Sequence, residues 1–262
     1  MKKILPVVAL CAQFFIACES LNSADENDDK SSSSVASRTS SSSVVSENPG
    51  SSSVSSSSKA LEPFEPTFVD YRDGKTYGAV KVENQIWMAQ NLNYQVNHSF
   101  CYDKTGSNCD KYGRLYTWAG IMDTLGGLSS NGKGCGYGST TCAPTYPVQG
   151  ICPQGWHLPS KEEFETLIEA LGGKYTSGPK LKSKSGWKDS GNGTDDYEFT
   201  ALPSGRRTPD GVYDLLGEYG DLWSSTMVDA TTANVLILTA VFRTDVGSAD
   251  MRSAFAVRCI KD

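Results

Sequence analysis

Residues 152–173 read CPQGWHLPSKEEFETLIEALGG, and this stretch decides the fold of the chain. Ser160 followed by Glu163 forms a capping box, in which each residue satisfies a backbone N–H of the other at the start of a helix. The helix is predicted over 161–171, with Gly172 as its stop and one apolar stripe made of Phe164, Leu167, Ile168 and Leu171. A helix with such a stripe needs a core to pack on.

Short strands are predicted on both sides of this helix. Before it, Thr67–Tyr71 and Thr76–Val82 flank the hairpin-turn pair Asp73-Gly74, and Gln85–Ala89 follows a second short turn. The domain is therefore predicted to open as a small β-meander. After the helix, four further strands are predicted over 197–202, 222–226, 234–241 and 254–260.

Three other segments complete the expected organisation. A second helix is predicted over Lys111–Met122, because Leu115, Trp118, Ala119 and Met122 recur at helical spacing. Residues 126–150 contain seven glycines and two cysteines, which is typical of a stapled surface loop. Residues 173–196 are rich in Gly, Ser, Lys and Asp, and irregular stretches of this length are often functional.

The first 60 residues have the order of an export address followed by a tether. Lys2 and Lys3 precede an apolar run ending at Ala17, so residues 1–17 are predicted to be a signal peptide, and Cys18 resembles the lipid-modified first residue of a bacterial lipoprotein. An ordinary signal peptide cut nearby is the alternative. Residues 18–60, with 17 serines between 31 and 58, are predicted to be a disordered linker to one domain over 61–262. Glu19 favours the outer membrane.

Composition excludes two classes of function. The formal net charge of −6 and the absence of a Lys/Arg run argue against a nucleic-acid partner. The chain contains only His98 and His157 as histidines, which excludes a multi-histidine metal centre.

The cysteines indicate an oxidising compartment. Of eight, Cys11 leaves with the signal peptide and Cys18 takes the lipid, so six remain for three disulfides with fifteen connectivities. Proximity favours Cys101 with Cys109 and Cys135 with Cys142, which leaves Cys152 with Cys259. Zinc is the competing interpretation, and the two-residue spacing of a zinc knuckle is missing.

Six ordered motifs carry a family resemblance over about 67–261: QIWMAQNLN at 85–93, YGRLYTW at 112–118, CPQGWHLPS at 152–160, ALPSGR at 201–206, WSST at 223–226 and VRC at 257–259. Together they resemble the Fibrobacter succinogenes major paralogous domain. The resemblance implies an α+β, C-type lectin-like fold, related also to formylglycine-generating enzymes. In that fold a cysteine before a capped helix and another in the last strand tie the helix to the terminal sheet.

Neither relative's chemistry transfers directly to this sequence. Thr208-Pro209-Asp210 and Trp223-Ser224-Ser225 lack the paired ligands with which C-type lectins bind sugar through calcium. Four oxygen-bearing residues in the irregular segment could hold calcium: Asp189, Asn192, Asp195 and Asp196. A solvated turn is the favoured alternative for them. Cysteine catalysis needs a thiolate, which disulfide pairing removes. His157, just before the helix cap, is expected to make structural hydrogen bonds.

The aromatic residues divide into a predicted core and a predicted surface. Trp87, Trp118, Trp156 and Trp223 lie in strand or helix patterns and are expected to be buried. Trp187 lies in the irregular segment and is expected to be exposed. A ligand-binding surface is hypothesised from Trp187, Tyr197, Arg206, Arg207, Asp210 and Tyr213.

These features predict a lipid-anchored protein of the outer membrane, displayed at the cell surface and acting as a non-catalytic binding or adhesion module. The expected partner is a polysaccharide or a surface protein, with no resident cofactor and no catalytic or metal-binding residues. The alternatives are an enzyme related to the formylglycine-generating type and a structural envelope component.

Overall fold

The computed structural model describes residues 64–241 and 243–262, which belong to one compact unit. The predicted signal peptide, Cys18 and the serine-rich linker lie outside the described residues. The unit contains helices and mostly short antiparallel strands, so its class is α+β, as predicted. Among the described residues, no helix has the length and apolar character needed to span a bilayer.

The first sheet holds the opening and the closing strands of the domain. Its order is β1 (Thr67–Asp70), β2 (Lys75–Val82), β3 (Gln85–Met88), β13 (Ile260–Lys261) and β6 (Trp156–His157). β1 and β6 are its two edges, and Phe68 of β1 nevertheless stacks on Trp156 of β6, with ring centroids 4.3 Å apart. The sheet is therefore strongly curved, and the predicted β-meander is confirmed.

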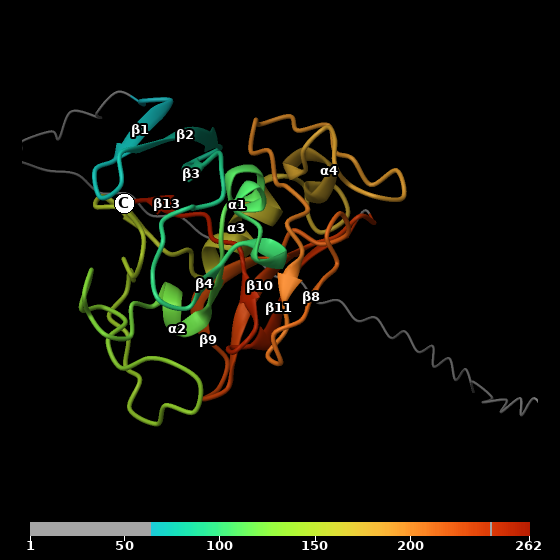
Figure 1. The fold of residues 1–262 in the computed structure, drawn as a ribbon. Coiled ribbons are helices and arrows are strands. Elements are labelled where there is room, and N and C mark those ends of the chain that lie inside the picture. The colour runs from blue at the N-terminus through green and yellow to red at the C-terminus, as the bar shows by residue number, and fades with distance from the viewer. Residues whose placement is uncertain (1–63, 242) are drawn as a thin grey trace, which may run out of the picture. The chain divides into compact units, whose positions relative to one another are not determined.

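Two further sheets follow. The second has the order β11 (Thr244–Asp250), β10 (Thr232–Leu238), β9 (Leu222–Met227), and the third has β4 (Ser99–Phe100), β5 (Leu115–Thr117), β12 (Ala254–Phe255), β7 (Arg206–Arg207), β8 (Tyr213–Asp214). The helical elements are η1 (Tyr102–Lys104), α1 (Gly106–Tyr112), α2 (Trp118–Ile121), α3 (Lys161–Ala170) and α4 (Ser177–Leu181). Figure 1 shows the elements around the central helix α3.

Helix α3 begins as the sequence predicts. Ser160 Oγ accepts from the Glu163 N–H at 3.1 Å, and Glu163 Oε2 accepts from the Ser160 N–H at 2.7 Å. The apolar stripe packs on one of two buried clusters, where Phe164 stacks on Trp87 at 5.6 Å between centroids. This packing supplies most of the stability of a helix that would be marginal alone.

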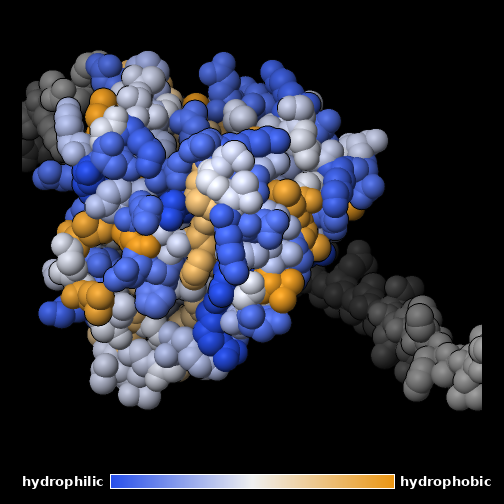
Figure 2. All heavy atoms as spheres, in the orientation of Figure 1, coloured by the Kyte–Doolittle hydropathy of each residue, from blue (hydrophilic) through white to orange (hydrophobic). Residues whose placement is uncertain are grey.

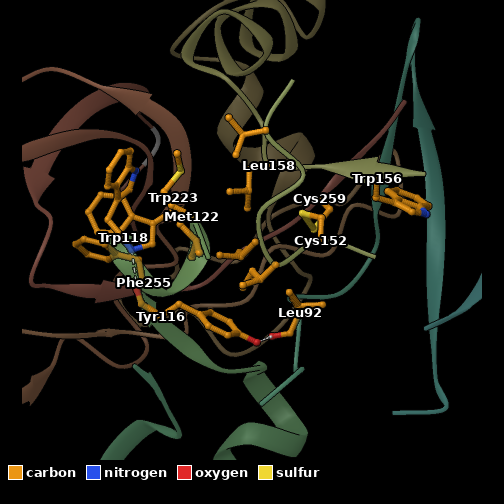
Figure 3. Packing of buried hydrophobic residues seen from close by; sticks show 14 of the residues in the cluster. Leu92, Tyr116, Trp118, Met122, Cys152, Trp156, Leu158, Trp223, Phe255 and Cys259 are labelled. Atoms are coloured by element: carbon orange, nitrogen blue, oxygen red, sulfur yellow. Dashed lines mark hydrogen bonds between the residues drawn. A yellow bond between two sulfur atoms is a disulfide. The ribbon is translucent and has the colours of Figure 1, made fainter. Parts of the chain in front are cut away.

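The second buried cluster is rich in tryptophan. Figure 3 shows Trp118, Trp223, Phe255 and Tyr116 gathered on one side of the Cys152–Cys259 disulfide, with Trp156 on the other. The indole N–H of Trp118 donates to Ser224 O at 2.9 Å, and that of Trp223 donates to Tyr116 O at 2.7 Å. The four tryptophans predicted to be core are buried.

Several predictions of secondary structure were wrong, each for a local reason. Lys111–Met122 is not one helix, because Gly113 at φ 75° ends α1 with its Cα packed so closely on Asn91 that a Cβ would lie 2.7 Å from the Asn91 Cβ. Residues 197–202 form no strand, since Glu198 and Thr200 have left-handed backbone at φ 56° and 50°. The predicted strand 254–260 is divided into β12 and β13, and β11 was not predicted.

All three disulfides join the predicted cysteine pairs: Cys101–Cys109, Cys135–Cys142 and Cys152–Cys259. The last joins the segment just before β6 to the segment just before β13, across 107 positions of sequence. The six cysteines of the described residues are thereby all paired.

Candidate functional site

Trp187 does not belong to an exposed surface, which corrects the sequence-based hypothesis. Its side chain is 5% exposed, and its indole N–H donates to Ser183 Oγ at 3.1 Å and to Ala201 O at 3.2 Å. The ammonium of buried Lys182 lies 5.0 Å from the centre of its ring. Trp187 is therefore the core around which the irregular segment folds, as its size favours.

Four of the other hypothesised residues come together on the β7–β8 hairpin. Arg206 pairs with Asp214 at 2.9 Å, Arg207 lies 4.4 Å over the ring of Phe100, and Asp210 accepts from Thr208 Oγ1 at 2.6 Å. Tyr213 packs edge-on against Tyr102; neither Tyr102 nor Phe100 was among the residues hypothesised from the sequence. Tyr197 is half-buried against the buried cluster on which α3 packs. Most polar groups of this hairpin are thus already engaged within the protein.

The hypothesised calcium cluster serves a turn. Asp195 accepts from the Thr200 N–H and from Thr200 Oγ1, both at 2.7 Å, and Asn192 Oδ1 accepts from the Trp187 N–H at 3.0 Å. Their side-chain oxygens therefore stabilise the turn by accepting hydrogen bonds within it. Across residues 64–241 and 243–262, no group of three or more His, Cys, Asp or Glu side chains is placed to hold a metal ion.

His157 makes structural hydrogen bonds, as predicted. Its Nδ1 lies 2.7 Å from Asp262 Oδ1 and its Nε2 lies 2.9 Å from Glu163 Oε1. Burial opposes the charged imidazolium, but hydrogen bonds to the two carboxylates raise the pKa of His157 above its usual value. The residue therefore joins the start of α3 to the segment after β13.

A hollow lies away from these residues, between the first sheet and α1. This β2–α1 groove has a volume of about 640 Å³ and is walled by β2 and the segment 89–93 on one side, and by 109–113 and the turn 198–202 on the other. Pockets of this size accommodate small ligands or a few units of a chain. In Figure 1 α1 is drawn between the β2–β3 hairpin and the side of the domain that carries α4.

The walls of the groove are joined from beneath by Arg258. This arginine is fully buried, and its guanidinium donates to Asn91 Oδ1 at 2.7 Å, to Thr200 O at 2.7 Å and to Phe199 O. Asn91 in turn donates to Tyr112 O at 2.9 Å. Burial lowers the pKa of Arg258 to about 9, so the group stays charged at neutral pH. No ion pair of Arg258 occurs among the described residues, so neutral acceptors alone hold this charge.

The same arrangement fixes an unusual turn at the rim. Asp195, Glu198 and Thr200 all have left-handed backbone, at φ 52°, 56° and 50°. Such residues persist where their surroundings over-determine them. Here Asp195 holds Thr200 by two hydrogen bonds and Arg258 holds the two carbonyls at 199 and 200, which presents Glu198 at the groove.

The rim of the groove carries polar atoms that have no hydrogen-bond partner within residues 64–241 and 243–262. Gln90 Oε1 accepts from the Gly78 N–H at 2.6 Å, which leaves its amide N–H groups free. Among the described residues, no side-chain hydrogen bond is formed by Asn93, Asp110 or Glu198. The Lys111 ammonium lies 4.8 Å over the ring of Tyr112. These groups are available to a ligand.

The position of this site could not be predicted from the sequence, although many of its residues belong to the motifs that define the family resemblance. The motif segments 85–93, 112–118, 201–206 and 257–259 supply residues of the groove wall or its floor. Figure 2 shows a face on which hydrophobic residues form small separate patches among hydrophilic ones. No single large apolar patch marks a binding surface on this face, so the groove with its polar rim is taken as the candidate site.

The fold and the groove define a disulfide-bonded α+β domain with an open candidate binding site that carries polar groups at its rim. Residues 80–261 match the model of the Fibrobacter succinogenes major domain, and the chain belongs to this family. The family description names no ligand and no reaction. No curated protein matches the chain, and no solved structure does.

Proposed function

We propose that this chain is a surface-displayed lipoprotein of the outer membrane whose domain is a non-catalytic binding or adhesion module, with the β2–α1 groove as its ligand site. The observation that carries the proposal is a set of amide, carboxylate and ammonium groups that have no hydrogen-bond partner in the described part of the chain. They surround a groove whose walls are joined by the hydrogen bonds of Arg258. Preorganised polar groups in an open groove favour binding. The ligand is a polysaccharide or a protein of the cell surface.

Two further observations support this function over catalysis. The six cysteines of the described residues are in disulfides, and thiolate chemistry of the formylglycine-generating type needs a free thiol. The capped helix joined by Cys152–Cys259 to the closing strand agrees with a C-type lectin-like fold, a fold used here to present a binding surface. A fold alone does not fix a function, so the groove has to be tested directly.

Binding is tested with the mature chain carrying Cys18→Ser, which stays soluble without lipid. We expect retention on a glycan array or on immobilised polysaccharide, and loss of retention in the variant Asn93→Ala combined with Glu198→Ala. The matched control is Arg207→Ala with Tyr213→Ala on the β7–β8 hairpin, which should bind as the parent does. Loss of retention in the control alone would show that the ligand binds at the hairpin. If no glycan and no surface protein retained the parent chain, the proposed binding function would be wrong.

Anchoring is tested separately. In a host that processes lipoproteins, the native chain should incorporate labelled fatty acid, and Cys18→Ser should not. Protease added to whole cells should then remove the domain. A labelled chain that resists protease on intact cells would contradict surface display, while an unlabelled chain would contradict the anchor.

A further inference from the structure

The β2–α1 groove also carries information about its ligand, and the inference drawn from it rests on the function proposed above. We infer that the groove binds an uncharged, hydroxyl-rich polysaccharide chain by hydrogen bonds, and discriminates against acidic glycans. Charge, hydrogen-bond inventory and the absence of a free strand edge each support this assignment.

With Lys75 already paired, the charged side chains of the rim leave a small negative excess and no anion site. Lys75 is held by Asp73 at 2.8 Å and by Asn93 O at 2.7 Å. Among the described residues this leaves Lys111 as the cation of the lining without an ion-pair partner, against the carboxylates of Asp110 and Glu198. A carboxylate or sulfate of an acidic glycan would lie close to these two like charges. Arg258 cannot offset this repulsion directly, because it is fully buried beneath the acceptors that it holds.

The free polar atoms match hydroxyl groups. The Gln90 amide and the Lys111 ammonium donate, the Asp110 and Glu198 carboxylates accept, and the Asn93 amide can do both. A sugar hydroxyl donates and accepts at once, so a pair of neighbouring hydroxyls uses a mixed set of this kind. A carboxylate of a ligand could only accept from the donors of this set, and an ammonium of a ligand could only donate to its acceptors.

The groove is poorly suited to two other ligands. An extended peptide would add to a free strand edge, but β2 is paired on both sides, with β1 and with β3. A flat crystalline glycan face would need exposed aromatic rings, and the two aromatic residues of the lining, Tyr77 and Tyr112, are only 4% and 9% exposed. A single hydrated chain lying in the groove satisfies both constraints.

The inference is tested with the Cys18→Ser chain in affinity electrophoresis and calorimetry against three probes: galactomannan as the neutral chain, polygalacturonate as the acidic one and chitosan as the cationic one. We expect binding to galactomannan that changes less than about twofold between 50 and 500 mM NaCl, since ion pairs would be screened. Polygalacturonate should be bound at least about tenfold more weakly, which corresponds to about 1.4 kcal/mol.

Isosteric variants locate the contact without removing structural hydrogen bonds. Gln90→Glu keeps the oxygen that accepts from Gly78 but replaces the free amide N–H groups by a carboxylate, and we expect about a fivefold loss of galactomannan affinity. Gln154→Glu makes the same change on an exposed residue outside this groove and should leave the affinity unaltered. Unchanged binding in Gln90→Glu would show that the ligand does not bind in the groove.

The possible outcomes distinguish failure of the neutral-polysaccharide inference from failure of the proposed binding function. Tighter, salt-sensitive binding of polygalacturonate or of chitosan would overturn the neutral ligand and leave the binding module intact. No binding of any of the three probes, together with an empty glycan array, would overturn both. Equal binding of all three would show that the rim does not discriminate, which also contradicts the inference.

Discussion

Residues 126–150 and residues 173–221 are both long and poor in regular structure, yet they are held in different ways. The first contains no helix or strand, buries few side chains and is closed by Cys135–Cys142. The second has no disulfide, but it folds around Trp187 and includes buried Lys182, Phe199 and Asp221. A disulfide and a buried side chain are thus alternative ways to order a chain that has little secondary structure. We call 126–150 the stapled segment, after its disulfide, and 173–221 the plugged segment, after the buried plug Trp187.

The difference lies in where the polar groups of each segment find partners. In 173–221, Lys182 is 1% exposed and its ammonium donates to Thr239 O at 3.0 Å and to Val241 O at 3.3 Å. Burial lowers the pKa of this lysine. In 126–150 the polar side chains mostly face solvent, and Tyr137 remains 46% exposed. The plugged segment is therefore predicted to unfold with the core, and the stapled one to depend on its disulfide.

Removing the plug should give the largest effect. Trp187→Ala is expected to lower the free energy of unfolding by about 3–5 kcal/mol, because it deletes a buried ring and removes the indole N–H that donates to the Ser183 hydroxyl and to the Ala201 carbonyl. Urea unfolding followed by fluorescence measures the change. Tyr175→Ala, in the same segment but 74% exposed, is the control. A loss below about 1 kcal/mol would mean that Trp187 does not organise the segment.

A buried carboxyl at the end of the same segment should make stability depend on pH. Asp221 is 5% exposed, and burial raises its pKa from 3.8 to about 7 despite a hydrogen bond from the Leu238 N–H. Between these values the folded state binds more protons than the unfolded state, so stability falls as pH rises. The total reaches at most about 4 kcal/mol, at about 1.4 kcal/mol per unit.

Asp221→Asn tests this coupling, since the amide oxygen can still accept from Leu238 but carries no titrating proton. We expect the variant to be more stable than the parent at pH 8 and to lose the decline between about pH 4 and 7. Thermal unfolding across that range measures the difference between the two chains. Parallel pH profiles would show that Asp221 keeps an ordinary pKa.

Removing the staple should give a smaller effect. The loop closed by Cys135–Cys142 spans 7 positions, and its double replacement by serine is expected to lower the free energy of unfolding by about 2 kcal/mol. Proteolysis should then begin within 126–150 while the plugged segment stays protected. Simultaneous cleavage of both segments would show that they are not independent.

The smallest effect is expected at the surface of the stapled segment. Tyr137 lies under the Arg252 guanidinium, 4.2 Å from the centre of its ring, and is 46% exposed. Tyr137→Ala is expected to change the unfolding free energy by less than about 0.5 kcal/mol. Chemical denaturation of the two chains side by side measures this. A loss comparable to that of Trp187→Ala would erase the contrast between the segments.

The sequence predicted the parts of the fold that depend on local rules. The capped helix α3, the Asp73-Gly74 hairpin, the buried tryptophans and the disulfide pairing all follow from spacing and residue type. The helix over 111–122 failed because a close approach between Gly113 and Asn91 is a tertiary contact. β11 escaped notice because its pairing with β10, not its own composition, makes it a strand.

The candidate site was harder to predict for a related reason. Trp187 has the flanking residues of an exposed loop, and only the placement of Ser183 and Ala201 around it shows that it is buried. Arg258 forms no ion pair among the described residues, so its role is visible only in the hydrogen bonds that it donates to Asn91 and to the carbonyls of 199 and 200. The groove is assembled from the regions 75–93, 109–113 and 198–202, which a linear pattern cannot bring together.

The disulfide between Cys152 and Cys259 has a consequence for survival outside the cell. It closes a covalent ring that contains the whole plugged segment, helix α3 and the second sheet. A protease that cuts once anywhere between these cysteines opens the chain but releases no fragment. The nicked protein would keep its mass and both walls of the groove, and the cut would become visible on a denaturing gel only after reduction.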